Sequence, residues 1–266
     1  MTAIACEPAS PVLWGEVRTL PGAIGDDAIL MIRGDSGALA RAPGVVVRTT
    51  GPVCEGSIRV AADGQGGVFA AWWAPREDSN AVLVVARRAA ADSGWAAPVV
   101  ADARDRGRAG CGRAAPGIAA DAARGYVHLA YYLDAPAGAG VYGGHSMESG
   151  TYFHDPVAVV YGDRPVPAAI ATSGDIAVVA YEDPNSARPR IAVGISLTAG
   201  HLYLERLDAS PSSMRAKSPR VAVDGRRIAV AWTAEEWEQG AQGSRAMTRV
   251  GTITDDAKSG LGGNER

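Results

Sequence analysis

The chain has 266 residues, of which 47% are apolar and 21% are charged, and its formal net charge is −3. Without a basic face, we expect no nucleic-acid partner, because such binding needs clustered Lys and Arg. Apolar runs all stay well short of the roughly 18 residues that cross a bilayer, so we expect no membrane span. The 33 glycines and 16 prolines are typical of short strands joined by turns. The bias toward Ala and Val, with two Phe, suggests a bacterial source.

The N-terminal segment predicts three strands. Asp27–Arg33 followed by Pro43–Arg48 parallels Asn80–Ala86 followed by Pro98–Ala101, so residues 27–50 predict the outer two strands of a first repeat. A further strand, Val12–Arg18, has two possible places. It supplies either an inner strand of that first repeat or the missing fourth strand of the last repeat. The second option closes a ring with both termini and removes an exposed sheet edge.

From residue 57 onward one hairpin recurs, and its clearest copy runs from Val221 to Trp232 with a turn at Asp224-Gly225. The equivalent positions Val60, Ile118, Ile170 and Val221 follow one another at intervals of 58, 52 and 51 residues. Periods near fifty with four strands each predict the blades of a β-propeller. Helical periodicity is absent, which makes the fold all-β. The second strand of each copy ends in an aromatic residue: Trp73, Tyr132, Tyr181 and Trp232.

The repeats predict four-stranded antiparallel blades. The expected strands are 58–63, 67–73, 81–88 and 97–102, then 117–121, 125–132, 139–145 and 156–161, then 168–173, 175–181, 189–196 and 202–208, and finally 219–224, 227–233 and 244–253. We therefore predict one propeller domain over residues 1–254, with five blades at about 12–50, 57–104, 115–162, 166–209 and 217–254. The polar, Gly-rich residues 255–266 predict a flexible tail.

The links between the third and fourth strands carry a second signature. Ser146-Met-Glu-Ser-Gly-Thr-Tyr-Phe153 resembles the Asp-box of sialidase-type propellers, a Ser-x-Asp-x-Gly-x-Thr-Trp pattern in that link. Partial copies stand at 90–95, 196–203 and 34–37. Over most of residues 27–253 the chain thus resembles a degenerate member of the sialidase or BNR-repeat propellers. Asp-boxes stabilise turns, so this resemblance implies a fold and gives these residues no catalytic role.

In a propeller, the loops between strands two and three share a face with the links between blades, and the resemblance implies that this face holds the ligand. Here acidic residues follow the aromatic residues in those loops, and an arginine stands at a similar distance before three inner strands. Such a funnel suits a sugar, which stacks on aromatic rings and bonds to charged groups. Alternatively, the aromatic residues cap the sheet interfaces and the charges are solvated. The predicted ligand-binding residues are Trp73, Arg113, Tyr132, Arg164, Tyr181, Arg215 and Trp232.

Catalysis is a second hypothesis. Sialidases place three Arg on the substrate carboxylate and use a Tyr–Glu nucleophile pair and an Asp acid, but this chain lacks their Arg-Ile-Pro motif and shows five repeats instead of six blades. Trp73-Ala-Pro75 is similar to a stretch of five-bladed arabinanase-type glycosidases. We therefore expect a propeller that binds a carbohydrate, another polar ligand or a partner protein without turnover. The alternative is a glycoside hydrolase with paired carboxylates. Its candidate carboxylates are Glu182, Asp183, Glu235 and Asp134.

Three cysteines, Cys6, Cys54 and Cys111, show no zinc-like spacing. Cys54 and Cys111 precede equivalent strands by six and seven residues, so a disulfide between them is one pairing, and a bridge from Cys6 to either is another. A disulfide suits a secreted or periplasmic protein, although the first residues do not have the features of a signal peptide. The four histidines show no paired spacing, and we expect no metal and no cofactor. We place His145 and His154 on the face opposite the funnel.

Overall fold

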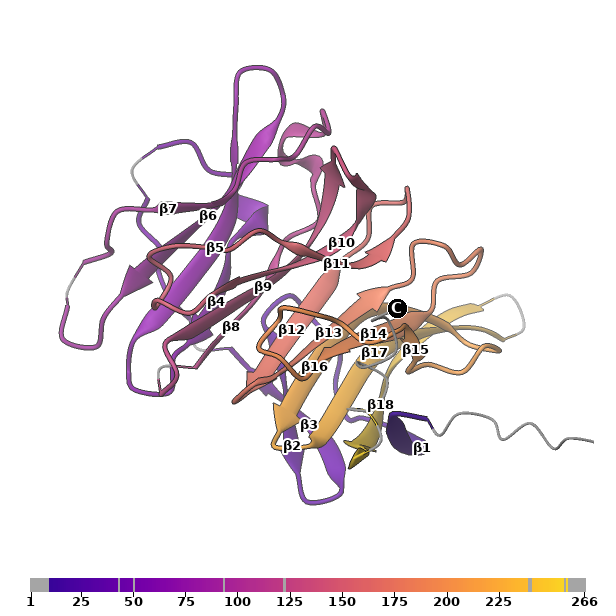
Figure 1. The fold of residues 1–266 in the computed structure, drawn as a ribbon. Helices are drawn as coiled ribbons and strands as arrows, with labels where there is room; N and C mark the ends of the chain where they lie inside the picture. The colour runs from indigo at the N-terminus through magenta and orange to yellow at the C-terminus, as the bar shows by residue number, and fades with distance from the viewer. Residues whose placement is uncertain are drawn as a thin grey trace, which may run out of the picture.

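A computed structural model describes residues 10–42, 44–49, 51–92, 94–121, 123–238, 241–255 and 257. The described residues form antiparallel β-sheets, joined by turns and two short 3₁₀ segments, Glu55–Ser57 and Gly110–Gly112 (Figure 1). Within those residues no helix has the length and apolar character needed to cross a membrane.

Five sheets make up the structure, and we number them as blades in chain order. Blade one contains β2 (Ala28–Arg33) and β3 (Ser36–Arg41). Blade two contains β4 (Arg59–Ala62), β5 (Val68–Pro75), β6 (Ala81–Arg88) and β7 (Val99–Asp102). Blade three contains β8 (Gly117–Asp121), β9 (Tyr126–Ala135), β10 (Gly138–Ser146) and β11 (Val157–Tyr161). Blade four contains β12 (Ala168–Ser173), β13 (Ile176–Glu182), β14 (Ile191–Ser196) and β15 (Leu207–Asp208). Blade five contains β16 (Arg215–Asp224), β17 (Arg227–Glu238), β18 (Ala241–Ile253) and β1 (Val12–Thr19).

The inner strands of the five blades, β2, β4, β8, β12 and β16, together line one central channel of about 1080 Å³. Many of the side chains on its wall are small, such as Ala61, Ala119, Ala169 and Ala222, which leaves the channel wide. Sheets arranged radially around such a channel constitute a β-propeller, so the predicted all-β, five-bladed architecture is confirmed.

Ring closure involves both ends of the chain, as one of the two predicted options states. β1 pairs antiparallel with β18, from Val12 opposite Ile253 to Thr19 opposite Met247. The N-terminal strand is thus the outermost strand of blade five and covers the edge that β18 would otherwise expose. Just beyond β18, Ala257, the third residue of the predicted tail, is buried against the core of blades four and five. Residues 256 and 258–266 lie outside the described residues.

Blade one is the exception to four-stranded blades, and the prediction for it is wrong in two ways. Its two strands are the inner pair, because β2 lines the channel, and not the outer pair. The second strand is Ser36–Arg41, reached through a tight turn at Gly34-Asp35, and the described residues of 43–48 form no strand. Instead, Val47 packs against the face of blade two, and the carbonyl of Val46 accepts a hydrogen bond from the Trp95 indole.

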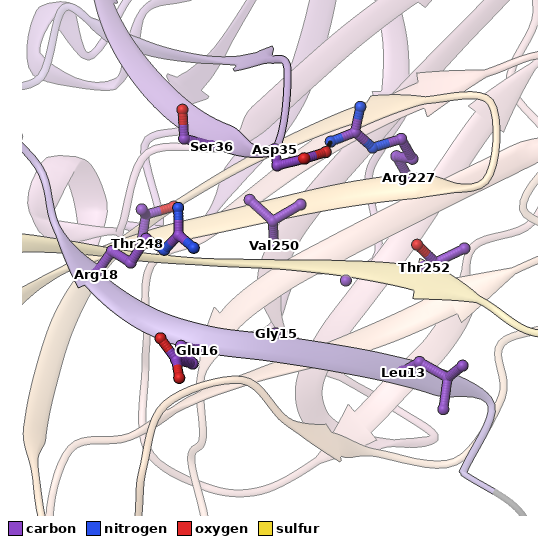
Figure 2. Close-up of a pocket in the computed structure, with 11 residues that line it drawn as sticks. Leu13, Gly15, Glu16, Arg18, Asp35, Ser36, Arg227, Thr248, Val250 and Thr252 are labelled. Atoms are coloured by element: carbon purple, nitrogen blue, oxygen red, sulfur yellow. Dashed lines mark hydrogen bonds and ion pairs between the residues drawn. The ribbon is translucent and has the colours of Figure 1, made fainter.

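A small pocket of about 270 Å³ lies beside this two-stranded blade (Figure 2). Strands β1 and β18 form one wall, and the β2–β3 turn forms the other. An ion pair between Arg227 and Asp35, 3.1 Å long, crosses from blade five to this turn. Because the residues 34–37 lie in this turn, between a first and a second strand, they do not occupy an Asp-box position.

The core lies between the blades, and in blades two and three the equivalent aromatic residue stands one position before the one expected. Val60, Ile118, Ile170 and Val221 stand opposite Ala70, Leu129, Val179 and Val230. Two positions further along the second strand are the equivalent residues Trp72, Tyr131, Tyr181 and Trp232. The last three pack with residues of the preceding blade, and Trp72 belongs to a cluster that Val47 and Val53 of the link into blade two cover. Trp73 and Tyr132 point the other way, since neighbouring side chains alternate across a strand.

Candidate functional site

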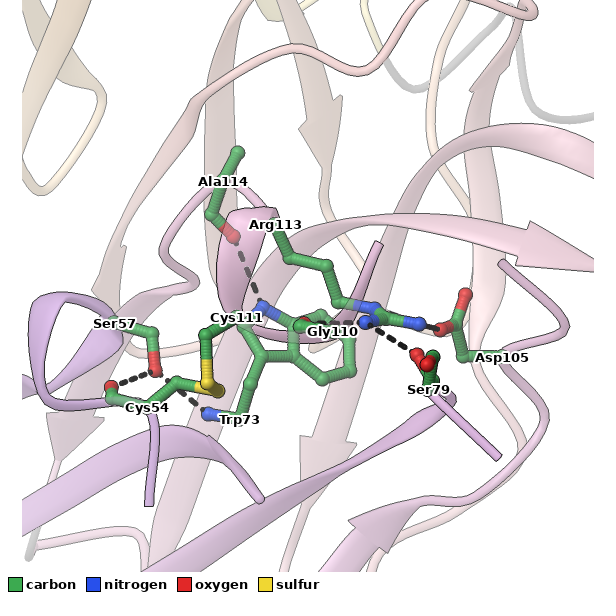
Figure 3. Close-up of a disulfide and its surroundings, with 9 residues drawn as sticks. All are labelled: Cys54, Ser57, Trp73, Ser79, Asp105, Gly110, Cys111, Arg113 and Ala114. Carbon is green, nitrogen blue, oxygen red and sulfur yellow. Dashed lines mark hydrogen bonds and ion pairs between the residues drawn. A yellow bond between two sulfur atoms is a disulfide. The ribbon is translucent and has the colours of Figure 1, made fainter. Parts of the chain in front are cut away.

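The disulfide joins Cys54 to Cys111 at the rim between blades two and three (Figure 3). Both cysteines lie in links that lead into an inner strand, on the face that also carries the loops between second and third strands, which we call the funnel face. The Cys54 backbone is also tied into blade two, because its N–H donates to the Trp73 carbonyl at 2.9 Å. Ser57 Oγ donates to the Cys54 carbonyl and accepts from the Trp73 N–H. The rim is therefore held covalently and by hydrogen bonds.

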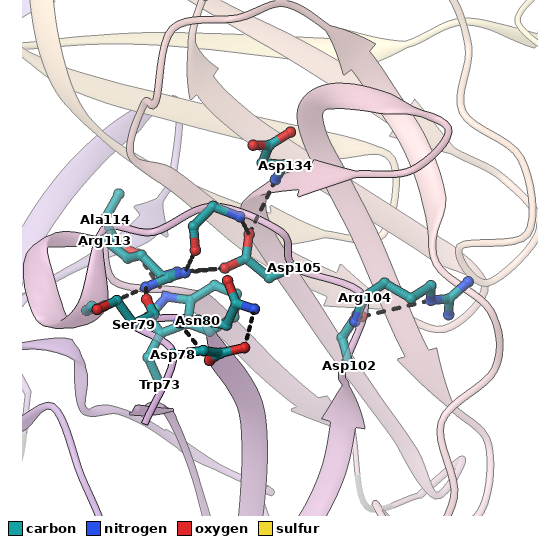
Figure 4. Close-up of polar contacts among 12 residues, drawn as sticks. Trp73, Asp78, Ser79, Asn80, Asp102, Arg104, Asp105, Arg113, Ala114 and Asp134 are labelled. Atoms are coloured by element: carbon teal, nitrogen blue, oxygen red, sulfur yellow. Dashed lines mark hydrogen bonds and ion pairs between the residues drawn. The ribbon is translucent and has the colours of Figure 1, made fainter. Parts of the chain in front are cut away.

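Arg113 belongs to the same rim, and its guanidinium is hydrogen-bonded to other groups of the protein (Figure 4). Its Nε donates to Asp105 at 2.7 Å, and its terminal nitrogens donate to Asp105 and to the carbonyls of Gly107, Gly110 and Ser79. The charge also lies over the Trp73 ring, 5.8 Å from its centroid. All five N–H groups of the buried Arg113 guanidinium thus donate within the protein.

The predicted stacking residues Trp73, Tyr181 and Trp232 are in the core, each with 0% of its surface exposed. Trp73 donates its indole N–H to the Ala114 carbonyl at 2.9 Å and meets Tyr131 edge to face. Trp232 donates its indole N–H to the sulfur of Met214. A fully buried ring offers no face to a sugar, and the burial of these three rings agrees with the interface-capping alternative.

The remaining candidates on blades three and four are dispersed. Tyr132 is half-buried, and its hydroxyl donates to the Gly162 carbonyl at 3.1 Å. Asp134 is exposed, near the end of β9. Asp183 is buried and caps a turn by accepting the Asn185 N–H, while its other oxygen lies 3.1 Å from Arg206. Since that carboxylate is already paired, we assign Asp183 a structural role.

Glu182, the last residue of β13, faces the start of β16 where blades four and five meet. Its Oε1 accepts the backbone N–H of Ser218 at 3.0 Å, and Ser218 also lines the central channel. Ser218 stands at a β-bulge between Lys217 and Arg220 and has a φ of 55°, a region that residues other than glycine rarely adopt. Bulges and strained residues of this kind concentrate where a strand re-aims a side chain for function.

Glu235 lies close to Glu182, and it stands on β17 opposite Arg215 of β16. Its two oxygens accept from the Nζ of Lys217 at 2.7 Å and from the Nε of Arg215 at 3.1 Å. Both cations keep about two fifths of their side-chain surface exposed, at 41% for Lys217 and 42% for Arg215, so their remaining donors are open to a ligand. Arg164 approaches from the preceding link, donates to the Asp183 carbonyl, and leaves its buried Nε without a partner.

The pKa values of Glu182 and Glu235 are shifted in opposite directions. Burial raises the pKa of Glu182, and the Ser218 N–H and the charges of Lys217 and Arg164 oppose that rise only in part. The hydrogen bond from Lys217 holds the pKa of Glu235 below its ordinary value, and Arg215 adds to the effect. Two carboxyls whose environments push their pKa values apart can divide the roles of acid and base. We define this cluster, Glu182, Glu235, Arg215, Lys217, Ser218 and Arg164, as the mouth cluster.

Sequence reasoning identified four members of the mouth cluster and missed Lys217 and Ser218. Lys217 is one of two lysines in the chain, and it stands immediately before Ser218-Pro219 at the start of an inner strand. The rarity of lysine and the proline, which restricts the residue before it, were the available signals. Glu236 and Trp237, which follow Glu235 on β17, have side chains outside the described part of the structure.

Comparisons with known proteins find similarity to solved structures at low sequence identity. No protein-family model matches the sequence, and no curated protein matches it significantly. A Hadza microbial sialidase is 12% identical over 71% of this chain, with a TM-score of 0.48. The catalytic domain of an alpha-L-arabinofuranosidase from Coprinopsis cinerea is 14% identical over 72% of this chain, with a TM-score of 0.44. A neuraminidase-like protein from a flat-faced bat isolate is 11% identical over 85%, with a TM-score of 0.49. The chain spans 43% of the first of these proteins and 63% of the second.

Proposed function

We propose that the chain binds a carbohydrate, or a similarly polar ligand, at the channel mouth between blades four and five, without turnover. The observation that carries this proposal is the mouth cluster, in which donors and acceptors of both charges lie next to Ser218, a residue that lines the channel of about 1080 Å³. A sugar hydroxyl both donates and accepts, so it suits a site where Glu235 accepts and Lys217 and Arg215 donate. Concave sites with a few convergent polar groups are typical of ligand binding.

Substitution of Lys217 by methionine tests the binding proposal. The change keeps the length of the side chain and removes its charged donor, and a lost charged hydrogen bond corresponds to roughly 10- to 100-fold weaker affinity. A glycan array identifies a ligand, and titration calorimetry then measures its affinity for both proteins. Arg227→Gln is the matched control, because it removes a cation from the ion pair at the β2–β3 turn. Equal losses in the two variants, or no glycan bound at all, would contradict the proposal.

Glycoside hydrolysis is the second candidate, and the opposite pKa shifts of the two glutamates favour it. In this reading Glu182, protonated more readily, donates a proton to the leaving oxygen, and the ionised Glu235 acts as base or nucleophile. Arg215 and Lys217 would keep Glu235 ionised. If the mouth cluster binds a partner protein instead of a glycan, the glycan array should show no binding.

Glu182→Gln and Glu235→Gln separate hydrolysis from binding. If the protein is a hydrolase, each variant should release sugar from a polysaccharide panel at least 100-fold more slowly, with a melting temperature close to that of the parent. If it only binds, the parent protein releases no sugar. Turnover that both variants retain would exclude these glutamates as the acid and base.

The disulfide and two turns support the wider assignment to secreted, sialidase-like propellers. Cys54–Cys111 is a bond that persists in oxidising compartments, and we therefore propose an extracytoplasmic location. In the Asp-box-like turns, Ser146 Oγ accepts the N–H of Glu148 and Gly150, and Ser196 Oγ accepts those of Thr198 and Gly200. A serine hydroxyl thus caps both turns in these degenerate boxes.

A further inference from the structure

The four histidines of the chain, although scattered in the sequence, meet at the seam between blades three and four, on the face opposite the funnel. His128 and His145 stand side by side on β9 and β10. His154 follows in the β10–β11 link, and His201 belongs to the β14–β15 link of blade four. The His145 ring lies 4.3 Å from that of His201, 4.7 Å from that of His154 and 6.4 Å from that of His128, measured between centroids.

Two of these rings are buried without any hydrogen bond. His128 and His145 expose 1% and 2% of their surface, and neither ring nitrogen of either residue has a partner. His128 Nδ1 faces the backbone of Gly200, on the turn that carries His201. Among the described residues, no group of three or more His, Cys, Asp or Glu side chains is placed to hold a metal ion. Each of these two imidazoles, when neutral, keeps one nitrogen that can take up a proton.

The surroundings of the cluster provide little compensation for positive charge. Asp121, at the end of β8, acts on His128 through its charge, but one of its oxygens accepts the Ala123 N–H. The other neighbours are aromatic: Tyr126 meets His128 edge to face, and Tyr152 meets His154 in the same way. Asp175 across the seam is ion-paired with Arg124 at 2.9 Å and also faces the Tyr126 hydroxyl. Burial and the other imidazoles lower the pKa of both His128 and His145 to about 4.

We propose that this histidine cluster is an acid-sensitive latch, which holds the β14–β15 turn onto blade three at neutral pH and releases it when the rings are protonated. Like charges 4.3 to 6.4 Å apart repel one another, and rings buried among apolar groups are hydrated only when the seam opens. The turn is the part that can move, since β15 has only two residues, Leu207–Asp208. This proposal is independent of the ligand site on the funnel face.

The sign and size of the effect follow from the proton balance. The closed form binds protons on His128 and His145 near pH 4, and the open form binds them near the ordinary value of 6.5. Acidification below pH 6.5 therefore favours the open form until pH 4 is passed. Between pH 7 and pH 5 the opening equilibrium rises roughly 20-fold for each of the two rings.

Amide hydrogen exchange at pH 7 and pH 5, corrected for intrinsic rates and in the presence of EDTA, tests the latch. The N–H of Ala199, bonded to the Asp175 carbonyl, and that of Gly200, bonded to Ser196 Oγ, should lose protection at least 20-fold. The N–H of Ala216, bonded to the Pro189 carbonyl on the funnel face, should keep its protection. Equal losses at all three amides would indicate general acid unfolding and overturn the proposal, as would unchanged protection of the turn.

Variants and a direct titration complete the test. His145→Leu removes the central ring and should leave only the roughly 20-fold pH dependence of His128, in place of the product of the two rings, whereas Leu202→Ala, on the same turn, should preserve the full effect. If His145→Leu does not fold, the imidazole signals of the unmodified protein are followed by NMR. At least two rings should then titrate well below pH 6. Four histidines that all titrate near pH 6.5 would contradict a buried latch.

Discussion

Replacing Trp232 by alanine is expected to lower the free energy of unfolding by about 3 to 5 kcal/mol, the range for removing a large aromatic side chain from a packed core. The Trp232 ring is fully buried between blades four and five, where it packs with Val178, Val193 and Ile228. The substitution also removes the hydrogen bond that the indole N–H donates to the sulfur of Met214. Urea unfolding of both proteins measures the difference.

Tyr161→Ala is the matched control for Trp232→Ala. Tyr161, the last residue of β11, is also aromatic, but 55% of its surface is exposed, so its removal should cost less than about 1 kcal/mol. Comparable losses in the two variants would show that the burial of Trp232 does not determine its contribution. A Trp232 variant with unchanged stability and lost glycan binding would restore the stacking role that the sequence suggested.

Local patterns in the sequence were sufficient for blades two to five, because each of these blades repeats the same hairpin at a nearly constant interval. The first blade lacks that repeat. Its strands alternate small and branched residues as both inner and outer hairpins do, so Ala28–Arg33 could be matched to the third strand of blade two. Only the assembled ring shows that β2 lines the channel. The turn at Gly34-Asp35, with a φ of 51° at Gly34, was the local signal for the hairpin.

The aromatic positions illustrate how sensitive a strand is to register. Shifting a strand by one residue moves its side chains to the other face, and Trp72-Trp73 and Tyr131-Tyr132 offer two aromatic residues in succession. The sequence comparison aligned Trp73 and Tyr132 with Tyr181 and Trp232. The hydrogen-bonded register instead aligns Trp72 and Tyr131 with them.

Equal spacing of charged residues also did not imply equal roles. Arg113, Arg164 and Arg215 precede their inner strands at similar distances, but each meets different partners: Asp105, the Asp183 carbonyl and Glu235, respectively. The histidine cluster was beyond sequence reasoning for a related reason. Its members come from two blades, and their approach depends on how those blades pack.

Loss of the disulfide is expected to have an effect of similar size to Trp232→Ala. Cys54 and Cys111 are 57 residues apart, and closing a loop of that length reduces the entropy of the unfolded chain by an amount worth about 4 kcal/mol at 25 °C. The bond also anchors the link into β4 to the link into β8, at a rim where Ser57 and Arg113 make further contacts. The double variant Cys54→Ser/Cys111→Ser should therefore unfold at a markedly lower urea concentration.

Reduction of the unmodified protein provides the control for this prediction. A reductant should lower the unfolding midpoint of the parent to that of the double serine variant and leave the variant itself unchanged. Because Cys54 is also buried against the core of blades two and three, whereas Cys111 is exposed, Cys111→Ser alone breaks the bond, keeps the Cys54 side chain in place and so separates the bond from the packing. If the parent keeps its midpoint after complete reduction, the bridge does not stabilise the fold. The rim would then be held by the Ser57 and Arg113 hydrogen bonds.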